Sequence, residues 1–297
     1  AIKVTRRHFA AKGQPERYRI VTFEGAFHGR TLATLAATGA AKYLEGFGPP
    51  LDGFDQVALG AIDAVKKAVG PATAGILIEP VQGEGGVRSP APEFVRALRQ
   101  LCDERGLLLI FDEVQTGMGR TGDLFAYRRF GVTPDVMTLA KALGGGFPIG
   151  ACLATAEAAS GMTPGSHGST FGGNPLAVAA ANAVLDVMLA PEFFTHVQRV
   201  SLLLKQKLAS LVDRFPKVIS GIRGEGLLIG VKAEVPAADL IGALRNEKLL
   251  TVAAGDNVVR LLPPLTVSED EIDHAVGCIE RACIALLGAQ PARAVAR

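Results

Sequence analysis

Apolar strand-like runs alternate with helical patterns along the first half of this chain. The runs occupy residues 18–23, 74–79, 107–112, 136–140 and 150–154. Between the second run and the third, apolar residues recur three and four positions apart, which is the spacing of one helix face. Such alternation is typical of βαβ units, whose strands pair in parallel. The sequence therefore predicts an α/β fold with a mostly parallel sheet.

The last hundred residues follow a different pattern. In residues 192–215, apolar side chains recur at helical spacing. Residues 218–287 combine short strands with two helices, and Ser268 followed by three acidic residues marks the start of the last helix. We therefore predict a large domain over residues 1–190 and a smaller C-terminal α/β domain over residues 191–297.

Composition and charge exclude several classes of protein. With 297 residues and 48% hydrophobic content, the chain can bury a large core. A net charge of +2, with Lys and Arg scattered along the chain, provides neither a basic stripe for nucleic acid nor a polybasic membrane patch, and no apolar run reaches membrane-spanning length. The four cysteines have neither metal-ligand spacing nor the density of a disulfide scaffold. We expect reduced thiols, no metal site and a cytoplasmic location.

Two chemically versatile side chains stand at the ends of neighbouring strand-like runs. Asp112 ends one run, and Lys141, 29 residues later, follows the next run and leads into three glycines. Open α/β sheets bind their ligands at the carboxyl ends of strands. A lysine amine can form a Schiff base with the aldehyde of pyridoxal 5'-phosphate (PLP), and a carboxylate beside the pyridine nitrogen keeps that nitrogen protonated. The pair predicts a PLP site, although either residue alone would more often be a surface charge or a cap.

Long stretches around these two residues resemble one known family. The segment FDEVQTGMGRTGDLFAYRRFGVTPDVMTLAKALGGGFPIGACLAT, residues 111–155, is similar to the core of the class III aminotransferases, which are PLP enzymes of fold type I. The similarity extends to FEGAFHGRTLATLAATG at 23–39, IEPVQGEGG at 78–86, GSHGSTFGGNPLA at 165–177 and VVRLLPPLTV at 258–267. The resemblance implies a transaminase whose large domain binds PLP.

The resemblance also implies a set of cofactor-binding residues, which are Phe27, Asp112, Glu113, Val114, Gln115, Lys141 and Thr170. Phe27 and Val114 would pack on opposite faces of the pyridine ring, and Gln115 would reach the phenolic oxygen. Thr170 would bond the phosphate held by a neighbouring subunit, so the active unit would be a homodimer with shared sites. His28 would only shape the pocket. From the residues alone, a core phenylalanine and a turn threonine are the plainer interpretations.

Four residues are implied in substrate binding, which are Arg30, Glu84, Ser169 and Arg260. An arginine fork donates two parallel hydrogen bonds to a carboxylate, so two arginines can hold both ends of 2-oxoglutarate or glutamate. The family's amino donor reacts at the amine far from its α-carboxylate, which leaves Arg260 without a carboxylate partner. Glu84 would then pair with Arg260 and swing aside for 2-oxoglutarate. Without the resemblance, a surface ion pair is the simpler interpretation.

Within the class, FHGRT and GSHGSTFGGNPLA most resemble the acetylornithine aminotransferases. We expect the distal amine of N2-acetylornithine, or of N-succinyl-diaminopimelate, to pass to 2-oxoglutarate in arginine biosynthesis, with Arg30 on the donor's α-carboxylate and Ser169 near its acyl end. An ornithine or other omega-amino-acid aminotransferase is the alternative, and the histidine after Phe27 argues weakly against it. A PLP-binding fragment without turnover is a further alternative, because the family's N-terminal segment and its phosphate-binding turn are expected upstream of Ala1.

Overall fold

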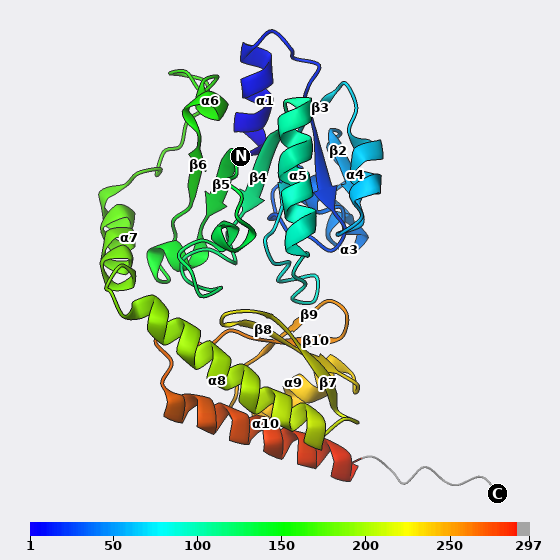
Figure 1. Ribbon diagram of the computed structural model, residues 1–297, viewed down its shortest axis with the longest axis vertical. Coiled ribbons are helices and arrows are strands. Elements are labelled where there is room, and N and C mark those ends of the chain that lie inside the picture. Colours follow the sequence, from blue (N-terminus) through cyan, green and yellow to red (C-terminus); the bar gives the residue numbers. More distant parts are fainter. Residues whose placement is uncertain (290–297) are drawn as a thin grey trace, which may run out of the picture.

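The computed structural model describes residues 1–289 and contains two β-sheets, drawn in the upper and lower halves of Figure 1. The first sheet has six strands in the order β2-β1-β3-β4-β5-β6. The strands are β1 (Arg19–Phe23), β2 (Phe54–Val57), β3 (Thr73–Ile78), β4 (Leu108–Asp112), β5 (Val136–Leu139) and β6 (Ala151–Ala154). All neighbours pair in parallel except β5 and β6. The predicted α/β fold with a mostly parallel sheet is confirmed.

Helices lie on both faces of this sheet. They are α1 (Ile2–Ala11), α2 (Leu32–Thr38), α3 (Ala41–Leu44), α4 (Ile62–Ala68), α5 (Pro92–Arg105), α6 (Ala156–Ala159) and α7 (Pro175–Met188), with short 3-10 helices η1 (Ala126–Phe130) and η2 (Lys141–Gly144). In β4, Leu109 and Phe111 pack with α5 on one face, whereas Leu108 and Ile110 pack with Phe9 of α1 on the other. Strands buried on both faces are continuous apolar runs, which makes them easy to predict. The edge strand β2 has two polar residues in four and was not predicted.

The second sheet is antiparallel, in the order β7-β8-β10-β9. Its strands are β7 (Ile219–Glu225), β8 (Leu228–Ala233), β9 (Val252–Ala254) and β10 (Val258–Leu261), and its helices are α8 (Phe193–Arg214), α9 (Ala237–Asn246) and α10 (Glu269–Ala289). As predicted, Ser268 starts the last helix, and its Oγ accepts a hydrogen bond from the Glu271 N–H at 3.2 Å.

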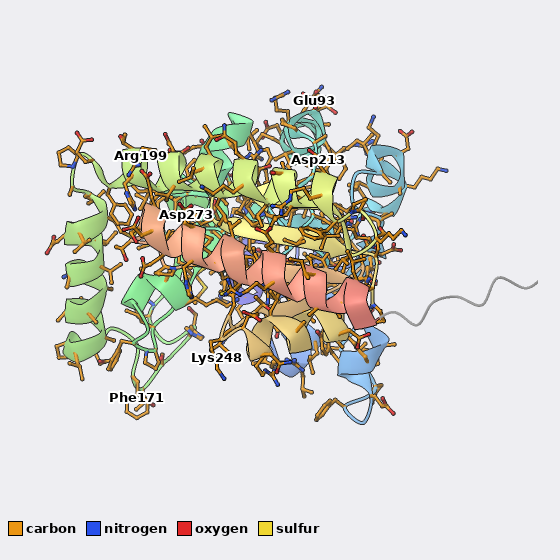
Figure 2. All side chains as sticks on the ribbon, turned by 90° about the horizontal axis from the view of Figure 1, so that it is seen from below. Glu93, Phe171, Arg199, Asp213, Lys248 and Asp273 are labelled. Atoms are coloured by element: carbon orange, nitrogen blue, oxygen red, sulfur yellow. The ribbon has the colours of Figure 1, made fainter. Side chains whose placement is uncertain are left out.

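Helices α8 and α10 lie side by side on the outer face of this sheet, as Figure 2 shows. Ion pairs join them at Arg199–Glu269, Lys207–Asp273 and Arg214–Glu280. The apolar side of α8 packs into the core with five fully buried residues, which are Val197, Val200, Leu204, Leu208 and Leu211. Helix α8 is therefore amphipathic, as its spacing predicts.

The chain bends between α7 and α8, and the boundary predicted at residue 190 falls at this bend. The division into two domains stays a prediction, and residues 290–297 of the second lie outside the described part of the chain. Within residues 1–289, no single helix is both long and apolar enough to cross a membrane, and only α7 and α8 taken together pass on length and composition.

Candidate active site

The carboxyl ends of β4 and β5 bring Asp112 and Lys141 to the same edge of the first sheet. Asp112 is the last residue of β4, and Lys141 begins η2, with one residue between it and the end of β5. Lys141 adopts a left-handed backbone conformation with a φ of 49°, which is unfavourable for a residue with a side chain. Such conformations persist where the surrounding structure holds them, and they are concentrated at functional sites. Because β4 and β5 pair in parallel, Asp112 and Lys141 lie at neighbouring strand ends, as the sequence predicts.

The Asp112 carboxylate is buried and held by three groups. Its Oδ1 accepts hydrogen bonds from Thr138 Oγ1 at 3.0 Å and from the Val114 N–H at 3.2 Å. Its Oδ2 lies 2.8 Å from Nδ1 of His28, whose side chain is 2% exposed. Thr138 faces Asp112 in the register of β4 and β5, so strand alternation could have identified it. His28 thus contacts the carboxylate directly and does more than shape the pocket.

Lys141 lines a cavity of about 640 Å³ whose walls come from both sheets. The other lining residues are Val114, Gln115, Arg120, Ala142, Gly146, Phe147, Pro148, Ile149, Val252, Arg260 and Leu262. Loss of hydration and the positive charge of Arg260 lower the pKa of the Lys141 amine below its usual value. The carboxylates of Glu84, Glu79 and Asp112 act in the opposite direction. The amine is therefore easier to deprotonate than a surface lysine.

Arg260 crosses from β10 to the loops of the first sheet. Its Nη2 donates to Glu84 Oε1 at 2.8 Å, and its Nη1 donates to Gln115 Oε1 at 2.9 Å. The predicted Arg260–Glu84 ion pair is thus present, with side-chain exposures of 9% and 30%. A Cβ at Gly83 would lie 2.3 Å from Gln115 Oε1, so a larger residue at this position would displace the Gln115 amide from Arg260.

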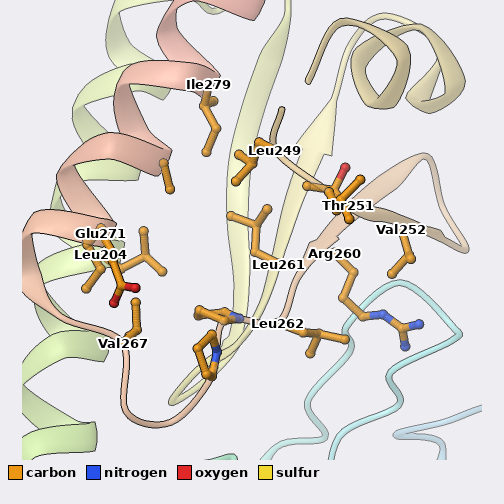
Figure 3. Close-up of a pocket in the computed structure, with 15 residues that line it drawn as sticks. Leu204, Leu249, Thr251, Val252, Arg260, Leu261, Leu262, Val267, Glu271 and Ile279 are labelled. Atoms are coloured by element: carbon orange, nitrogen blue, oxygen red, sulfur yellow. The ribbon is translucent and has the colours of Figure 1, made fainter. Parts of the chain in front are cut away.

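The apolar interior of the second sheet lies behind Arg260. Figure 3 shows a cavity of about 400 Å³, with Leu249 and Ile279 at its far end and the Arg260 guanidinium directed away from them. Apolar neighbours on this side reduce the hydration of the Arg260 side chain. An ion pair is stronger where water is excluded, so this packing strengthens the Arg260–Glu84 contact.

Two further polar residues of the site were not predicted. Glu79 follows β3 and is 2% exposed, and its Oε2 accepts a hydrogen bond from the Phe27 N–H at 2.9 Å. Burial, and then the charge of Asp112, raise the pKa of Glu79 well above its usual value. Arg120 donates to the carbonyls of Leu227 and Pro263, and burial lowers its pKa to about 10. Glu79 fixes the loop that carries Phe27, and Arg120 ties the cavity wall to the second sheet.

The loop after β1 carries Phe27 and Arg30. The Phe27 ring meets the Tyr43 ring edge to face, with centroids 5.8 Å apart. The Arg30 guanidinium lies 4.4 Å from the Tyr43 centroid and 5.5 Å from the Phe27 centroid. Tyr43 was not predicted as a site residue, and no sequence motif distinguishes it from an ordinary aromatic residue.

Of the predicted site residues, only Val114, Gln115, Lys141 and Arg260 line the cavity of about 640 Å³. Asp112 and Glu84 make hydrogen bonds with residues of its wall, and Phe27 and Arg30 lie on the loop after β1.

Three more predicted residues have other surroundings. Glu113 stays a prediction as a cofactor residue, and its buried carboxylate accepts hydrogen bonds from the N–H groups of Ala126 and Tyr127 and from the Thr116 hydroxyl, which stabilise the start of η1. Successive strand positions point to opposite sides, which explains why the Glu113 carboxylate points away from that of Asp112. Ser169 and Thr170 are exposed in the segment before α7 and do not line the cavity of this chain.

The residues at this edge fit PLP. Asp112 offers a carboxylate oxygen to a ring N–H, and Lys141 offers an amine. Gln115 Nε2 is buried and has no hydrogen-bond partner within residues 1–289, so it can donate to the phenolic oxygen of PLP. The glycines after Lys141 allow close packing, since a Cβ at Gly145 would lie 2.8 Å from Val184 of α7. The glycines that follow Lys141 therefore let this loop pack closely against α7.

Comparison with known proteins supports this chemistry. Residues 1–283 match the family Aminotransferase class-III. The chain is 77% identical over 293 residues to acetylornithine aminotransferase 1 of Bradyrhizobium diazoefficiens, which covers 99% of this chain and 72% of that protein. It is 61% identical over 290 residues to acetylornithine aminotransferase of Agrobacterium fabrum, which covers 98% and 73% respectively.

Solved structures share the fold. N-acetylornithine aminotransferase from Stenotrophomonas maltophilia aligns with a TM-score of 0.83 and 34% identity, over 97% of this chain and 72% of that chain. Ornithine aminotransferase from Toxoplasma gondii aligns with a TM-score of 0.92 and 31% identity, over 97% and 70%. The fold alone does not separate the two donor types, whereas sequence identity is much higher to the acetylornithine enzymes above.

Proposed function

Because this chain belongs to the class-III aminotransferases, we propose that it transfers the distal amino group of N2-acetylornithine to 2-oxoglutarate. The products are N-acetylglutamate 5-semialdehyde and glutamate, in a step of arginine biosynthesis. One observation carries the proposal: Lys141 shares a cavity with Arg260, beside the fixed carboxylate of Asp112. High identity to acetylornithine aminotransferases favours this donor over ornithine.

Asp112 and Gln115 would hold the cofactor. When bound, PLP supplies an aldehyde that joins an amine and a ring that accepts electrons. Thr138 and the Val114 N–H donate to Oδ1 of Asp112, and His28 Nδ1 lies 2.8 Å from Oδ2, so the carboxylate is held in place. Oδ2 has a second lone pair that can accept from a ring N–H. Gln115 keeps its Nε2 free for an oxygen because Oε1 already accepts from Arg260.

Lys141 moves the proton in this proposal. Its lowered pKa increases the fraction of neutral amine at a given pH, so Nζ can accept a proton from the substrate carbon that bears the reacting nitrogen. As an ammonium group, Nζ can then return a proton to the site. The left-handed backbone at Lys141 and the packed glycines after it fix the direction of this side chain.

The two arginines divide the recognition of substrate carboxylates. Arg30 would bind the carboxylate that lies far from the reacting carbon, which is the α-carboxylate of acetylornithine and the γ-carboxylate of 2-oxoglutarate. Arg260 would bind the second carboxylate of 2-oxoglutarate, for which Glu84 must move away. With acetylornithine no second carboxylate is present, and Glu84 keeps the Arg260 charge paired in a half-buried site. One cavity can thereby accept two unlike substrates.

We further propose a cytoplasmic homodimer with shared sites. Ser169 and Thr170 lie on an exposed segment where they could reach a second copy, and Phe171 beside them is 80% exposed. In Figure 2, Phe171 protrudes from the rest of the molecule. A large exposed aromatic side chain beside polar residues is typical of interface surface. Light scattering at several concentrations would measure the mass, and a monomer at all of them would refute the dimer.

A product assay tests the proposed donor. The protein, loaded with PLP, is incubated with 2-oxoglutarate and with acetylornithine, N-succinyl-diaminopimelate or ornithine in turn, and glutamate is measured by mass spectrometry. We expect acetylornithine to give the highest kcat/KM. A higher value for ornithine would refute the assignment of the donor, and no glutamate with any donor would refute transamination by this chain.

A further inference from the structure

Arg30 lies in an aromatic environment, unlike Arg260. Two rings lie within 6 Å of its guanidinium, those of Tyr43 at 4.4 Å and Phe27 at 5.5 Å. Within residues 1–289, no carboxylate lies within salt-bridge distance of Arg30, and its guanidinium makes no hydrogen bond. A ring face attracts a cation without using its N–H groups. Arg30 therefore has a fixed neighbour and still has every donor free.

A tight reversal of the chain brings Tyr43 to this place. Helix α2 begins just after Arg30 and ends at Gly39, whose φ of 66° is left-handed, and α3 then carries Tyr43 back. A Cβ at Gly39 would lie 2.3 Å from Gln56 Nε2, which donates to the Thr38 carbonyl at 2.7 Å. The reversal thus depends on glycine and on a specific hydrogen bond.

We propose that Tyr43 is a positioning residue for substrate recognition, whose ring face holds the Arg30 guanidinium ready for the α-carboxylate of the amino donor. The inference rests on the proposed function and extends it to a residue outside the motif that carries Arg30. A free arginine side chain loses conformational entropy when it binds a ligand. Contact with Tyr43 removes part of that freedom before the substrate arrives. A carboxylate partner would instead compete with the substrate.

The ring face, and not the hydroxyl, is the part of Tyr43 that contacts Arg30. Tyr43→Phe keeps the ring and should therefore keep recognition, whereas Tyr43→Leu removes it. We expect Tyr43→Leu to raise the KM for acetylornithine roughly 3- to 10-fold, with little change in kcat, as expected for loss of one cation–π contact. Tyr18→Leu is the matched control, since Tyr18 lies 5.6 Å from Arg6 in a similar pair elsewhere on the chain.

The test uses three ligands with the PLP-loaded enzyme. Acetylornithine carries the α-carboxylate and the amine, N-acetylputrescine has the amine without the carboxylate, and N-acetylnorvaline has the carboxylate without the amine. Stopped-flow half-reactions measure the two amines, and calorimetry measures the Kd of N-acetylnorvaline. We expect Tyr43→Leu to weaken acetylornithine and N-acetylnorvaline by the same factor and to leave N-acetylputrescine unchanged. Tyr43→Phe and Tyr18→Leu should match the wild type.

Other outcomes overturn the inference. Equal losses for all three ligands would mean that Tyr43→Leu disturbs the fold, and no loss would mean that the ring does not position Arg30. A Tyr43→Phe variant as weak as Tyr43→Leu would assign the effect to the hydroxyl. If the wild type does not convert acetylornithine at all, the proposed function fails as well, which distinguishes that failure from failure of the inference alone.

Discussion

The two arginines of the site are held in contrasting ways. Arg30 lies against the rings of Tyr43 and Phe27 with its donors free, whereas Arg260 is buried and paired with Glu84. The difference matches what each must do. Both substrates of the proposed reaction have a carboxylate for Arg30, so its partner need never leave. Only 2-oxoglutarate and glutamate have a carboxylate for Arg260. The partner of Arg260 in the protein is therefore also a carboxylate, that of Glu84, and the substrate carboxylate can replace it.

Both arginines would hold substrates for proton transfer by the same residue, Lys141. Loss of Lys141 should therefore affect both substrates equally. Lys141→Ala removes the amine that moves the proton, and we expect kcat to fall by about 10⁴-fold with acetylornithine and with glutamate alike. Borohydride reduction of the PLP-loaded wild type, followed by peptide mapping, checks the residue directly. A label on any other lysine would refute the assignment to Lys141.

Removal of Arg260 should separate the two substrates. In Arg260→Met the second carboxylate of 2-oxoglutarate loses a buried, charge-assisted partner, and we expect its kcat/KM to fall by about 100-fold. The half-reaction with acetylornithine should fall by a clearly smaller factor, because that donor has no group for Arg260 and loses only the effects of Arg260 on Lys141, Gln115 and Glu84. Stopped-flow measurement of each half-reaction gives both values. Equal losses would show that Arg260 supports the site in general.

Arg260 should also influence the titration of Lys141. Its charge is the second cause, after loss of hydration, that lowers the pKa of the Lys141 amine. Arg260→Met removes this repulsion, so the pKa of Lys141 should rise and the amine should become neutral only at higher pH. Competitive acetylation of the cofactor-free protein at several pH values, read by mass spectrometry at Lys141, measures the shift. A pKa that stays the same or falls would contradict the electrostatic account.

The sequence predicts the positions of Asp112 and Lys141 better than the contact between Arg260 and Glu84. Asp112 and Lys141 follow strands that are buried on both faces, and parallel strands bring their carboxyl ends to one edge. Arg260 in β10 and Glu84 in the turn after β3 are separated by 176 positions, so only the family resemblance could pair them. Their contact depends on the placement of β10, which no local pattern specifies.

The misses have similar physical causes. Tyr43 reaches Arg30 through a reversal at Gly39, and turn geometry of this kind is not encoded by apolar periodicity. The bonds of the Glu113 carboxylate to the start of η1 were not predicted, because they join it to backbone N–H groups 13 and 14 residues away. His28 was underrated because its partner, Asp112, is 84 residues away. Contacts between residues that are far apart in the sequence could not be predicted from local sequence patterns.

The substrate response of Glu84→Gln tests most directly whether Glu84 is the replaceable partner of Arg260. The substitution removes the negative charge and keeps the shape, so Arg260 is left uncompensated when acetylornithine binds and is freed for glutamate. Stopped-flow half-reactions should show kcat/KM falling about tenfold for acetylornithine, as loss of one charged hydrogen bond predicts, while the value for glutamate stays the same or rises. Equal losses for the two donors would contradict the account.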